Sequence, residues 1–330
     1  MPLEQRLRAR KDVQHLLLRI LHRKETGGAA RENQNFFAHG ARGSHAEPVV
    51  IERAPLEDEL GDVLDKALRR TGLTEQDLAA QSGVDAGRIR DVIDYREGLN
   101  ADEISRLAKA LQLNPVGLAA VAGGAYPLPE IRGLPFCLYP MRTSHGIGVA
   151  NAYIVADCSS DEGLLFDCGT DPEALRRVWP ARIKRLQAVL LTHHEAEHAG
   201  GLPEIRQRFP QVPVIAPPGP NLKGLTVTPQ DGTVLSFGGF EVRVWQTPGH
   251  VENHLCYVVT TRRSPKRTPL LVSGDVLFAG SVGGGYFCPE RLAGSLGRIF
   301  RELPSDTVVA PGHGPLTTIK NERAFNPFVS

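Results

Sequence analysis

The pattern of apolar and polar residues changes character twice along this chain of 330 residues. Residues 59–122 carry apolar side chains three and four positions apart, as amphipathic helices do. Residues 128–330 contain short runs rich in Val and Leu between Gly and Pro, which is the pattern of strands. These changes predict three parts: a leader and linker over 1–55, a helical domain over 56–124 and a sheet-rich domain over 125–330.

The helical part has side chains suited to N-capping at the starts of its helices. Four of them are Thr74, Asp85, Asn100 and Asn114, the last of which stands before a proline. Gly83 supplies a tight turn between the second and third helices. Five short helices with such a turn predict a helix-turn-helix arrangement.

The stretch "GLTEQDLAAQSGVDAGRIRDVIDYREGLNADEISRLAKALQLNP" resembles the Cro/CI-type (XRE) DNA-binding domains. The resemblance implies that the third helix enters the major groove, where Arg88 and Arg90 would reach bases. Against this, residues 59–122 hold eight Lys/Arg and eleven Asp/Glu, a net charge of −3, whereas DNA-binding surfaces are basic. Two hypotheses therefore stay open for residues 56–124: DNA binding, and a module for packing or for homodimer formation.

The first 55 residues hold ten Lys/Arg against six Asp/Glu. Their opening, "LEQRLRARKDVQHLLLRILHRK", is compatible with a basic amphipathic helix that contacts a membrane or nucleic acid. We favour a solvated leader instead, because residues 26–48 are polar and lack periodicity.

The bulk properties of the whole chain indicate neither a nucleic-acid binder nor a membrane protein. The formal net charge is +1, and no apolar run approaches the ~18 residues that span a bilayer. The five cysteines form no C-x-x-C pair. This predicts that all five are reduced thiols, each behaving as a small buried hydrophobic residue, and that the protein is cytoplasmic.

The sheet-rich part contains more predicted strands than helices. The strand-like runs are "NAYIVAD", "GLLFDCG", "LQAVLLT", "VPVIAPP", "GTVLSFGGFEVRVWQTPG", "LCYVVTT", "TPLLVSGD" and "TVVAPGHG". Helical stretches are predicted at about 172–185, 200–209 and 289–303. Some of the strands are joined as hairpins, so we expect an α/β fold of sheets with helices outside them.

The stretch "VLLTHHEAEHAGGLPEI", residues 189–205, has two interpretations. As the zinc-peptidase pattern H-E-x-x-H, it would place His194 and His198 on one helix face, with Glu195 as the general base. As an altered H-x-H-x-D-H loop, it would offer His193, Glu195, Glu197 and His198 to two metal ions. A strand-like "AVLLT" precedes the stretch, and two glycines and a proline follow it, so a continuous helix is disfavoured. We favour the two-metal loop.

Three further candidate ligands follow predicted strands in distant parts of the chain. They are His250 in "TPGHVENH", Asp275 in "LLVSGD" and His313 in "VVAPGHG". Each taken alone would more often be structural. Four strand ends with such side chains are hard to explain without a metal site.

With Asp167 in "FDCG" and the ending "PGHGPLTTIKNERAFNPFV", this pattern resembles the metallo-β-lactamase superfamily, above all its hydroxyacylglutathione-hydrolase (glyoxalase II) branch. The resemblance implies an αββα sandwich with two divalent metal ions at a sheet edge. It assigns the first metal to His193, Glu195 and His250, and the second to Glu197, His198 and His313. Asp275 would bridge them, Asp167 would support the ligand loops by hydrogen bonds, and His254 would lie behind the ligands.

The chain departs from the family pattern at two places. Glu195 and Glu197 stand where the family loop has His and Asp, and the Gly283–Gly285 segment replaces a charged loop. Carboxylate ligands favour iron or manganese over zinc relative to an all-His site, so Zn, Fe and Mn all remain open. The changed loop implies changed substrate contacts.

These features predict a metal-dependent hydrolase that attacks a small thioester or ester with metal-activated hydroxide. Glu197 would be the catalytic residue that orients the nucleophile and moves its proton. One alternative, motivated by Glu195, is an iron-dependent oxidoreductase of the flavodiiron or persulfide dioxygenase kind. Another is a DNA-binding regulator whose metallo domain senses a small molecule.

Overall fold

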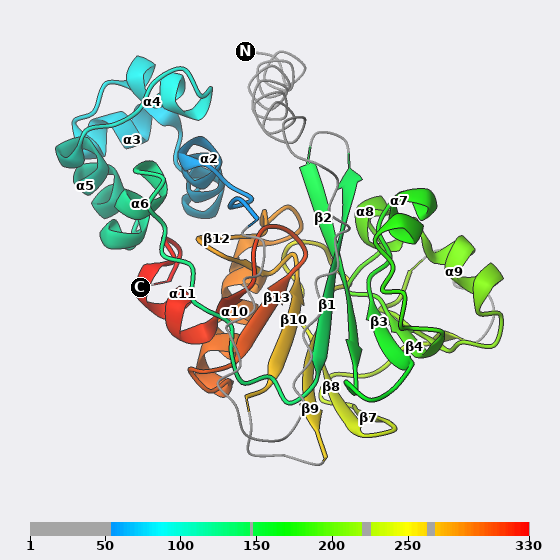
Figure 1. The fold of residues 1–330 in the computed structure, drawn as a ribbon. Coiled ribbons are helices and arrows are strands. Elements are labelled where there is room, and N and C mark those ends of the chain that lie inside the picture. The colour runs from blue at the N-terminus through cyan, green and yellow to red at the C-terminus, as the bar shows by residue number, and fades with distance from the viewer. Residues whose placement is uncertain (1–53, 146–147, 220–225, 263–267, 330) are drawn as a thin grey trace, which may run out of the picture.

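The computed structural model describes residues 54–145, 148–219, 226–262 and 268–329 (Figure 1). The predicted basic leader lies outside these described residues, apart from its last two positions. Within the described ranges, every helix is too short or too polar to cross a lipid bilayer.

The five helices predicted for the helical part are present. They are α2 (Leu60–Thr71), α3 (Glu75–Ser82), α4 (Ala86–Ile93), α5 (Ala101–Ala110) and α6 (Pro115–Ala122). Their N-terminal amides are capped as the sequence indicates: Thr74, Asp85 and Asn100 each accept a hydrogen bond from the amide three residues later. Gly83 makes the turn between α3 and α4 with a φ of +67°, in the left-handed region that favours glycine.

The sheet-rich part forms two six-stranded sheets among the described residues. In spatial order, the first sheet contains β1 (Cys137–His145), β2 (Gly148–Ala156), β3 (Glu162–Phe166), β4 (Arg185–Leu190), β5 (Val214–Ile215) and β6 (Thr226–Val227). The second contains β14 (Thr317–Thr318), β13 (Val308–Pro311), β10 (Leu270–Gly274), β9 (Leu255–Thr261), β8 (Phe240–Gln246) and β7 (Val234–Phe237). A short hairpin of β11 (Leu277–Phe278) and β12 (Ser281–Val282) follows β10.

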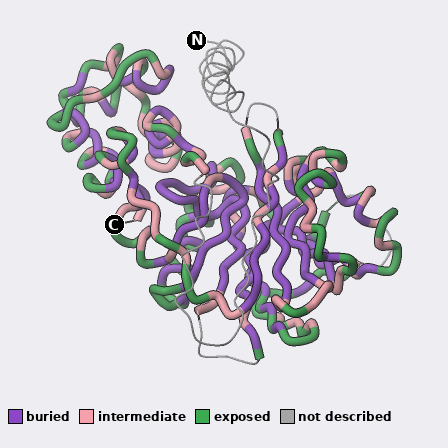
Figure 2. The backbone as a smooth tube through the Cα atoms, viewed as in Figure 1, coloured by how far each residue is buried: buried purple, intermediate pink, exposed green. Residues whose placement is uncertain are grey.

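The two sheets stack face to face. Since successive side chains of a strand point to opposite faces, one strand contributes apolar side chains to the space between the sheets and to an outer face. Leu255 and Tyr257 of β9 belong to the apolar cluster between the sheets. Cys256, which lies between them in sequence, belongs instead to the cluster on the outer face of the second sheet. Both faces are therefore covered, and Figure 2 shows the strands of both sheets as largely buried. The arrangement is the αββα sandwich expected from the resemblance.

Helices cover the outer faces of both sheets (Figure 1). The first sheet carries α7 (Pro172–Arg177), α8 (Ala196–Ala199) and α9 (Leu202–Arg208), and the second carries α10 (Pro289–Glu302) and α11 (Ile319–Phe325). Every run predicted as a strand contains at least one observed strand. The helix predicted over 172–185 is too long, since it ends at Arg177, before Pro180 and the start of β4. The sequence did not predict β1 or α11.

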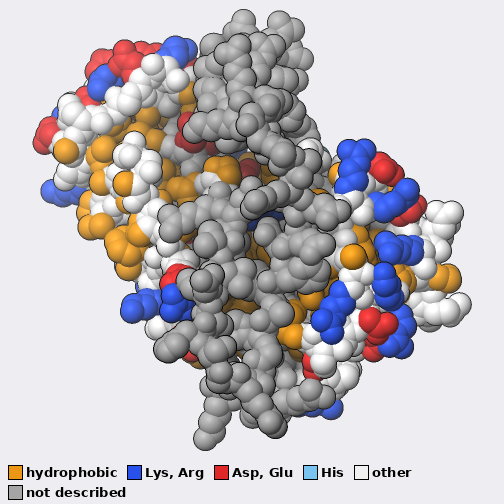
Figure 3. Space-filling view, in the orientation of Figure 1, with side chains coloured by type: hydrophobic (Ala, Val, Ile, Leu, Met, Phe, Trp, Pro, Cys, Tyr) orange, Lys and Arg blue, Asp and Glu red, His pale blue; other side chains and the backbone are white. Residues whose placement is uncertain are grey.

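The helical part packs directly on the sheet-rich part. Its apolar residues share one buried cluster with α10, α11 and the second sheet. Asn114, the N-cap residue of α6, binds α11 and the residues after it. Its amide donates to the Pro327 carbonyl at 2.7 Å and its side chain to the Ala324 carbonyl at 3.0 Å. On the outer end of the helical part, acidic and basic side chains lie side by side (Figure 3).

The prediction for the cysteines was wrong for three of the five. Cys137 and Cys158 form a disulfide, with their Cα atoms 5.1 Å apart. The reason is the antiparallel pairing of β1 with β2, which places Cys137 opposite Ala156, two residues before Cys158. Among the free thiols, Cys168 and Cys256 are buried as expected, whereas Cys288 is partly exposed.

Candidate metal centre

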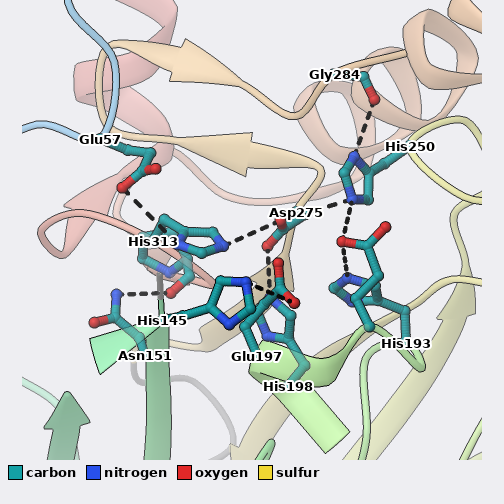
Figure 4. A network of polar contacts seen from close by, with 12 residues as sticks. Glu57, His145, Asn151, His193, Glu197, His198, His250, Asp275, Gly284 and His313 are labelled. Carbon is teal, nitrogen blue, oxygen red and sulfur yellow. Dashed lines mark hydrogen bonds and ion pairs between the residues drawn. The ribbon is translucent and has the colours of Figure 1, made fainter. Parts of the chain in front are cut away.

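Four strands of the two sheets deliver the candidate ligands to one place (Figure 4). His193 follows β4, His250 follows β8, Asp275 follows β10 and His313 follows β13. The remaining candidates lie on the chain just after β4: Glu195 precedes α8, and Glu197 and His198 lie within it. All seven candidate side chains therefore come from loops and one short helix at the same edge of the sandwich.

The ligand atoms fall into two groups. His193, Glu195, His250 and Asp275 form one, and Glu197, His198 and His313 form the other. Within each group, one ligand atom from every residue lies within 4.8 Å of the others. Apart from Asp275, which the family resemblance places between the two metals, these are the residues of the two sets that the resemblance implies.

Asp275 lies between the two groups. Its carboxylate oxygens are 3.7 Å from His250 Nε2, 3.4 Å from His198 Nε2 and 3.3 Å from His313 Nε2. One carboxylate thus faces imidazoles of both groups, which is the position that a bridging ligand requires.

The four imidazoles are all oriented in the same way by their Nδ1 atoms. The Nδ1 partners are Thr192 Oγ1 for His193, Asp167 Oδ2 for His198, the Gly284 carbonyl for His250 and the Val149 carbonyl for His313, all at 2.9–3.0 Å. With the Nδ1 proton donated to these acceptors, each Nε2 is left to face the shared space.

Several atoms facing that space are buried and unsatisfied. Among the described residues, the Nε2 atoms of His193, His198 and His250 and Oδ1 of Asp275 have no hydrogen-bond partner. Buried polar atoms without partners are costly, and native proteins rarely leave them so. Imidazole nitrogens and carboxylate oxygens converging in this way fit divalent cations.

The charges of these side chains depend on one another. Burial alone would raise the pKa of Asp275, but His313 and His198 outweigh it and hold that pKa well below its ordinary value. Burial alone would lower the pKa of His313, but Asp275 and Glu57 outweigh it and raise that pKa to about 10. In the metal-free protein His313 therefore carries a proton near neutral pH. A cation that binds Nε2 must displace this proton, so metal uptake releases protons.

Glu195 belongs to the site and His194 does not. Glu195 Oε2 is 3.7 Å from His193 Nε2 and 3.5 Å from His250 Nε2. These two imidazoles hold the pKa of Glu195 well below its ordinary value, so it is a carboxylate. The His194 ring instead lies 2.9 Å from the Pro217 carbonyl. Since α8 begins only at Ala196, His194 and His198 do not share a helix face, as an H-E-x-x-H site would need.

Asp167 supports the ligand loop through three hydrogen bonds. It accepts from the amide and the hydroxyl of Thr192, both at 2.8 Å, and pairs with His198 Nδ1. Its φ of +54° lies in the left-handed region, which Asp tolerates better than most residues. This is the supporting role that the resemblance implies for it.

His254 lies directly behind the ligands. Its Nε2 accepts a hydrogen bond from the Asp275 amide at 3.2 Å, and its Nδ1 is 2.8 Å from Thr247 Oγ1. Burial and the neighbouring His193 lower its pKa well below the ordinary value, so the ring is neutral. It fixes the backbone of Asp275 and offers no free nitrogen to a metal.

Two residues of the site were missed from the sequence. His145, at the end of β1, lies with Nε2 3.5 Å from Glu197 Oε2. Glu57, just before α2, lies with Oε2 3.8 Å from His313 Nδ1, and burial raises its pKa to about 7. The only local sequence signal for either residue was the position of His145 at the end of β1, a strand that was not predicted.

Two glycines let the backbone approach Asp275 closely. A Cβ added at Gly283 would collide with the Asp275 carbonyl, and one added at Gly312 would collide with its carboxylate. The glycine-rich segment noted in the sequence thus places backbone against the ligands. Its Gly284 carbonyl orients His250 (Figure 4).

The sequence matches the family model of the metallo-beta-lactamase superfamily over residues 145–313, which include all seven candidate ligands. This chain belongs to the metallo-β-lactamase superfamily. Members are generally hydrolytic enzymes and bind divalent metal ions. An uncharacterized protein of Aquifex aeolicus is 31% identical to this chain over 202 residues, which is 54% of this chain and 90% of that protein.

An enzyme and a solved structure are also similar to parts of this chain. The hydroxyacylglutathione hydrolase of Photorhabdus laumondii is 35% identical over 127 residues, or 38% of this chain and 47% of that enzyme. The chain thus spans about half the length of this relative. A metallo-beta-lactamase structure from Staphylococcus aureus superposes with a TM-score of 0.51 at 19% identity, covering 59% of this chain and 62% of that one. That likeness shows the shared fold.

Proposed function

We propose that this protein is a metal-dependent hydrolase that cleaves a small thioester or ester. The observation that supports it is the set of unsatisfied Nε2 atoms around Asp275, each held in place by a partner on Nδ1. The similarity to hydroxyacylglutathione hydrolases, whose name states a thioester-type substrate class, suggests the bond that is cleaved.

The residues of the two groups have separable roles in such a reaction. Divalent cations held by them would supply Lewis acidity and bring the pKa of water toward neutrality. Glu197 is the candidate proton acceptor, since its carboxylate is largely buried at the site and lies against His145. His145 is partly exposed and can pass a proton to solvent, while Asp275 fixes the spacing of the two groups.

Glu197→Gln is expected to lower kcat for thioester cleavage by about 10²–10⁴-fold, because general acid–base catalysis contributes that much. Released thiol would be followed with a hydroxyacyl thioester of glutathione as substrate, and released phenol with a simple aryl ester. Metal content is measured in parallel, since Glu197 also belongs to the second group. Glu204→Gln, which removes a carboxylate of α9 paired only with Arg176 in the described contacts, is the matched control. Unchanged kcat in Glu197→Gln would reject this role, and no ester cleavage by Zn- or Fe-loaded protein would reject the function.

An iron-dependent oxidoreductase is the second candidate, and Glu195 is the observation that favours it. A carboxylate in the first group makes the site harder and more suited to iron than three imidazoles would. Oxygen uptake by the Fe-loaded protein with a glutathione persulfide, without cleavage of any ester, would favour this candidate over the hydrolase.

For the helical domain, residues 56–124, we infer a packing role in preference to DNA binding. Arg88 pairs with Glu97 and Glu103, and Arg90 pairs with Glu75 at 2.7 Å. Both arginines expected to reach DNA bases thus already have carboxylate partners, in a region where acidic and basic side chains are mixed (Figure 3).

The full chain is accordingly expected not to retard duplex DNA in a gel at low salt, where phosphate contacts are strongest. The double variant Arg88→Ala plus Arg90→Ala serves as the comparison. Retardation by the unmutated chain that the double variant loses would restore the regulator hypothesis.

A further inference from the structure

A cavity of about 250 Å³ lies between α2 of the helical domain and α10. One wall carries the basic side chains Lys66, Arg69 and Arg70, and the other carries apolar side chains of α10. Among the residues that the structure describes, no acidic side chain lines it. We propose that this cavity binds a small aliphatic or aromatic carboxylate, with its acid group at the α2 wall and its apolar part against α10.

Of the three basic side chains on this wall, two pair with carboxylates of the described chain and one does not. Lys66 pairs with Asp58, and Arg69 pairs with Asp65 at 3.0 Å. Arg70 has no carboxylate partner among the described residues: it donates to the carbonyls of Leu111 and Gln112, at 2.6 and 2.9 Å. A half-buried guanidinium beside an apolar surface, with neutral acceptors alone, is complementary to an anion.

The opposite wall is suited to a short apolar chain. Leu292, Leu296 and Phe300 repeat every four residues along α10, so they form one stripe facing the cavity. Phe328 extends this surface and lies under the Arg70 guanidinium, 5.3 Å from ring centre to charge. At ~30 Å³ per water molecule, the volume corresponds to roughly eight waters, which sets the size of the ligand at about eight non-hydrogen atoms.

The cavity also adjoins the metal centre without being part of it. Gly283 and Gly285 line it, and Gly284 between them orients His250 through its carbonyl. None of the seven candidate metal ligands lines the cavity. Binding here therefore requires neither metal nor hydrolysis, and it stands apart from the proposed function.

The test is calorimetric titration of the metal-free full chain with hexanoate, which has about the required size. Hexanoate is expected to bind saturably at one site per chain, 1-hexanol at least ~10-fold more weakly, and hexylammonium not at all, since only the carboxylate makes charge-assisted hydrogen bonds to the basic wall. Equal binding of hexanoate and hexanol would refute the basic wall as the recognition element.

Variants of α10 and α2 test the location. Gly297 lines the cavity and a Cβ there meets nothing within 4 Å, so Gly297→Leu should fill the space and abolish binding. Gly294 lies on the same helix, is equally open and does not line the cavity, so Gly294→Leu should leave binding unchanged. Arg70→Gln should weaken hexanoate at least ~10-fold, whereas Arg291→Gln, an α10 charge outside the cavity, should not.

Two outcomes would overturn the proposal. Binding that survives Gly297→Leu would place the carboxylate elsewhere. Binding that appears only after metal is added would place it on the metal centre. Circular dichroism and metal uptake of each variant establish that the fold is retained, so loss of binding in Gly297→Leu reports the cavity itself.

Discussion

Asp275→Asn is expected to reduce the bound metal from two ions per chain to at most one. Asp275 is the carboxylate that faces imidazoles of both groups, within 3.3–3.7 Å of three Nε2 atoms. The amide removes the negative charge and can turn an N–H toward nitrogens that must stay free to coordinate. Ester cleavage should fall about 10²-fold or more, because Lewis acid activation contributes several kcal/mol. Metal analysis of the purified variant and kcat/KM are the measurements.

Asp306→Asn is the matched control, since that carboxylate accepts a hydrogen bond from the Thr268 hydroxyl at 3.3 Å and belongs to neither group of candidate ligands. It should retain both ions. An unmutated protein with one ion or fewer would contradict the two-metal arrangement and leave a mononuclear site. Two ions retained in Asp275→Asn would show that this carboxylate does not bridge the groups.

Four of the candidate ligands were predictable from the sequence because each follows a strand whose apolar run is visible locally. His250 and His313 each stand directly after a Pro-Gly pair, at the end of β8 and β13. Parallel pairing of β10 with β13 then brings Asp275 and His313 to the same end of one sheet. Local pattern and family resemblance thus lead to the same side chains.

The contacts between distant segments were not predictable in this way. Glu57 reaches His313 only because the helical part packs against α10 and α11, and nothing near Glu57 in sequence indicates that packing. His145 and the disulfide of Cys137 both depend on β1, which pairs along its full length with β2. Its sequence, "CLYPMRTSH", contains a proline and polar residues that obscure the strand pattern.

Glu195→His, compared with His194→Ala, tests the ligand set and the metal together. Glu195 lies 3.5 Å from His250 Nε2, and its replacement by imidazole restores the loop usual in the family. Metal should remain bound, but the preference should shift from iron or manganese toward zinc, because a hard oxygen ligand has become a nitrogen. Metal analysis after growth with both Zn and Fe measures the shift.

His194→Ala supplies the contrast, since it removes a neighbouring imidazole that is directed at the Pro217 carbonyl and away from the site. Its metal content should equal that of the unmutated protein. Loss of metal in His194→Ala would bring back the helix-borne H-E-x-x-H interpretation. An unchanged metal preference in Glu195→His would mean that the carboxylate is no ligand, and the argument for iron would then have no support. The two residues are adjacent in sequence, but the Glu195 side chain points to the candidate metal site and the His194 side chain points away from it. Comparing the two variants therefore distinguishes loss of a ligand from a general disturbance of the loop.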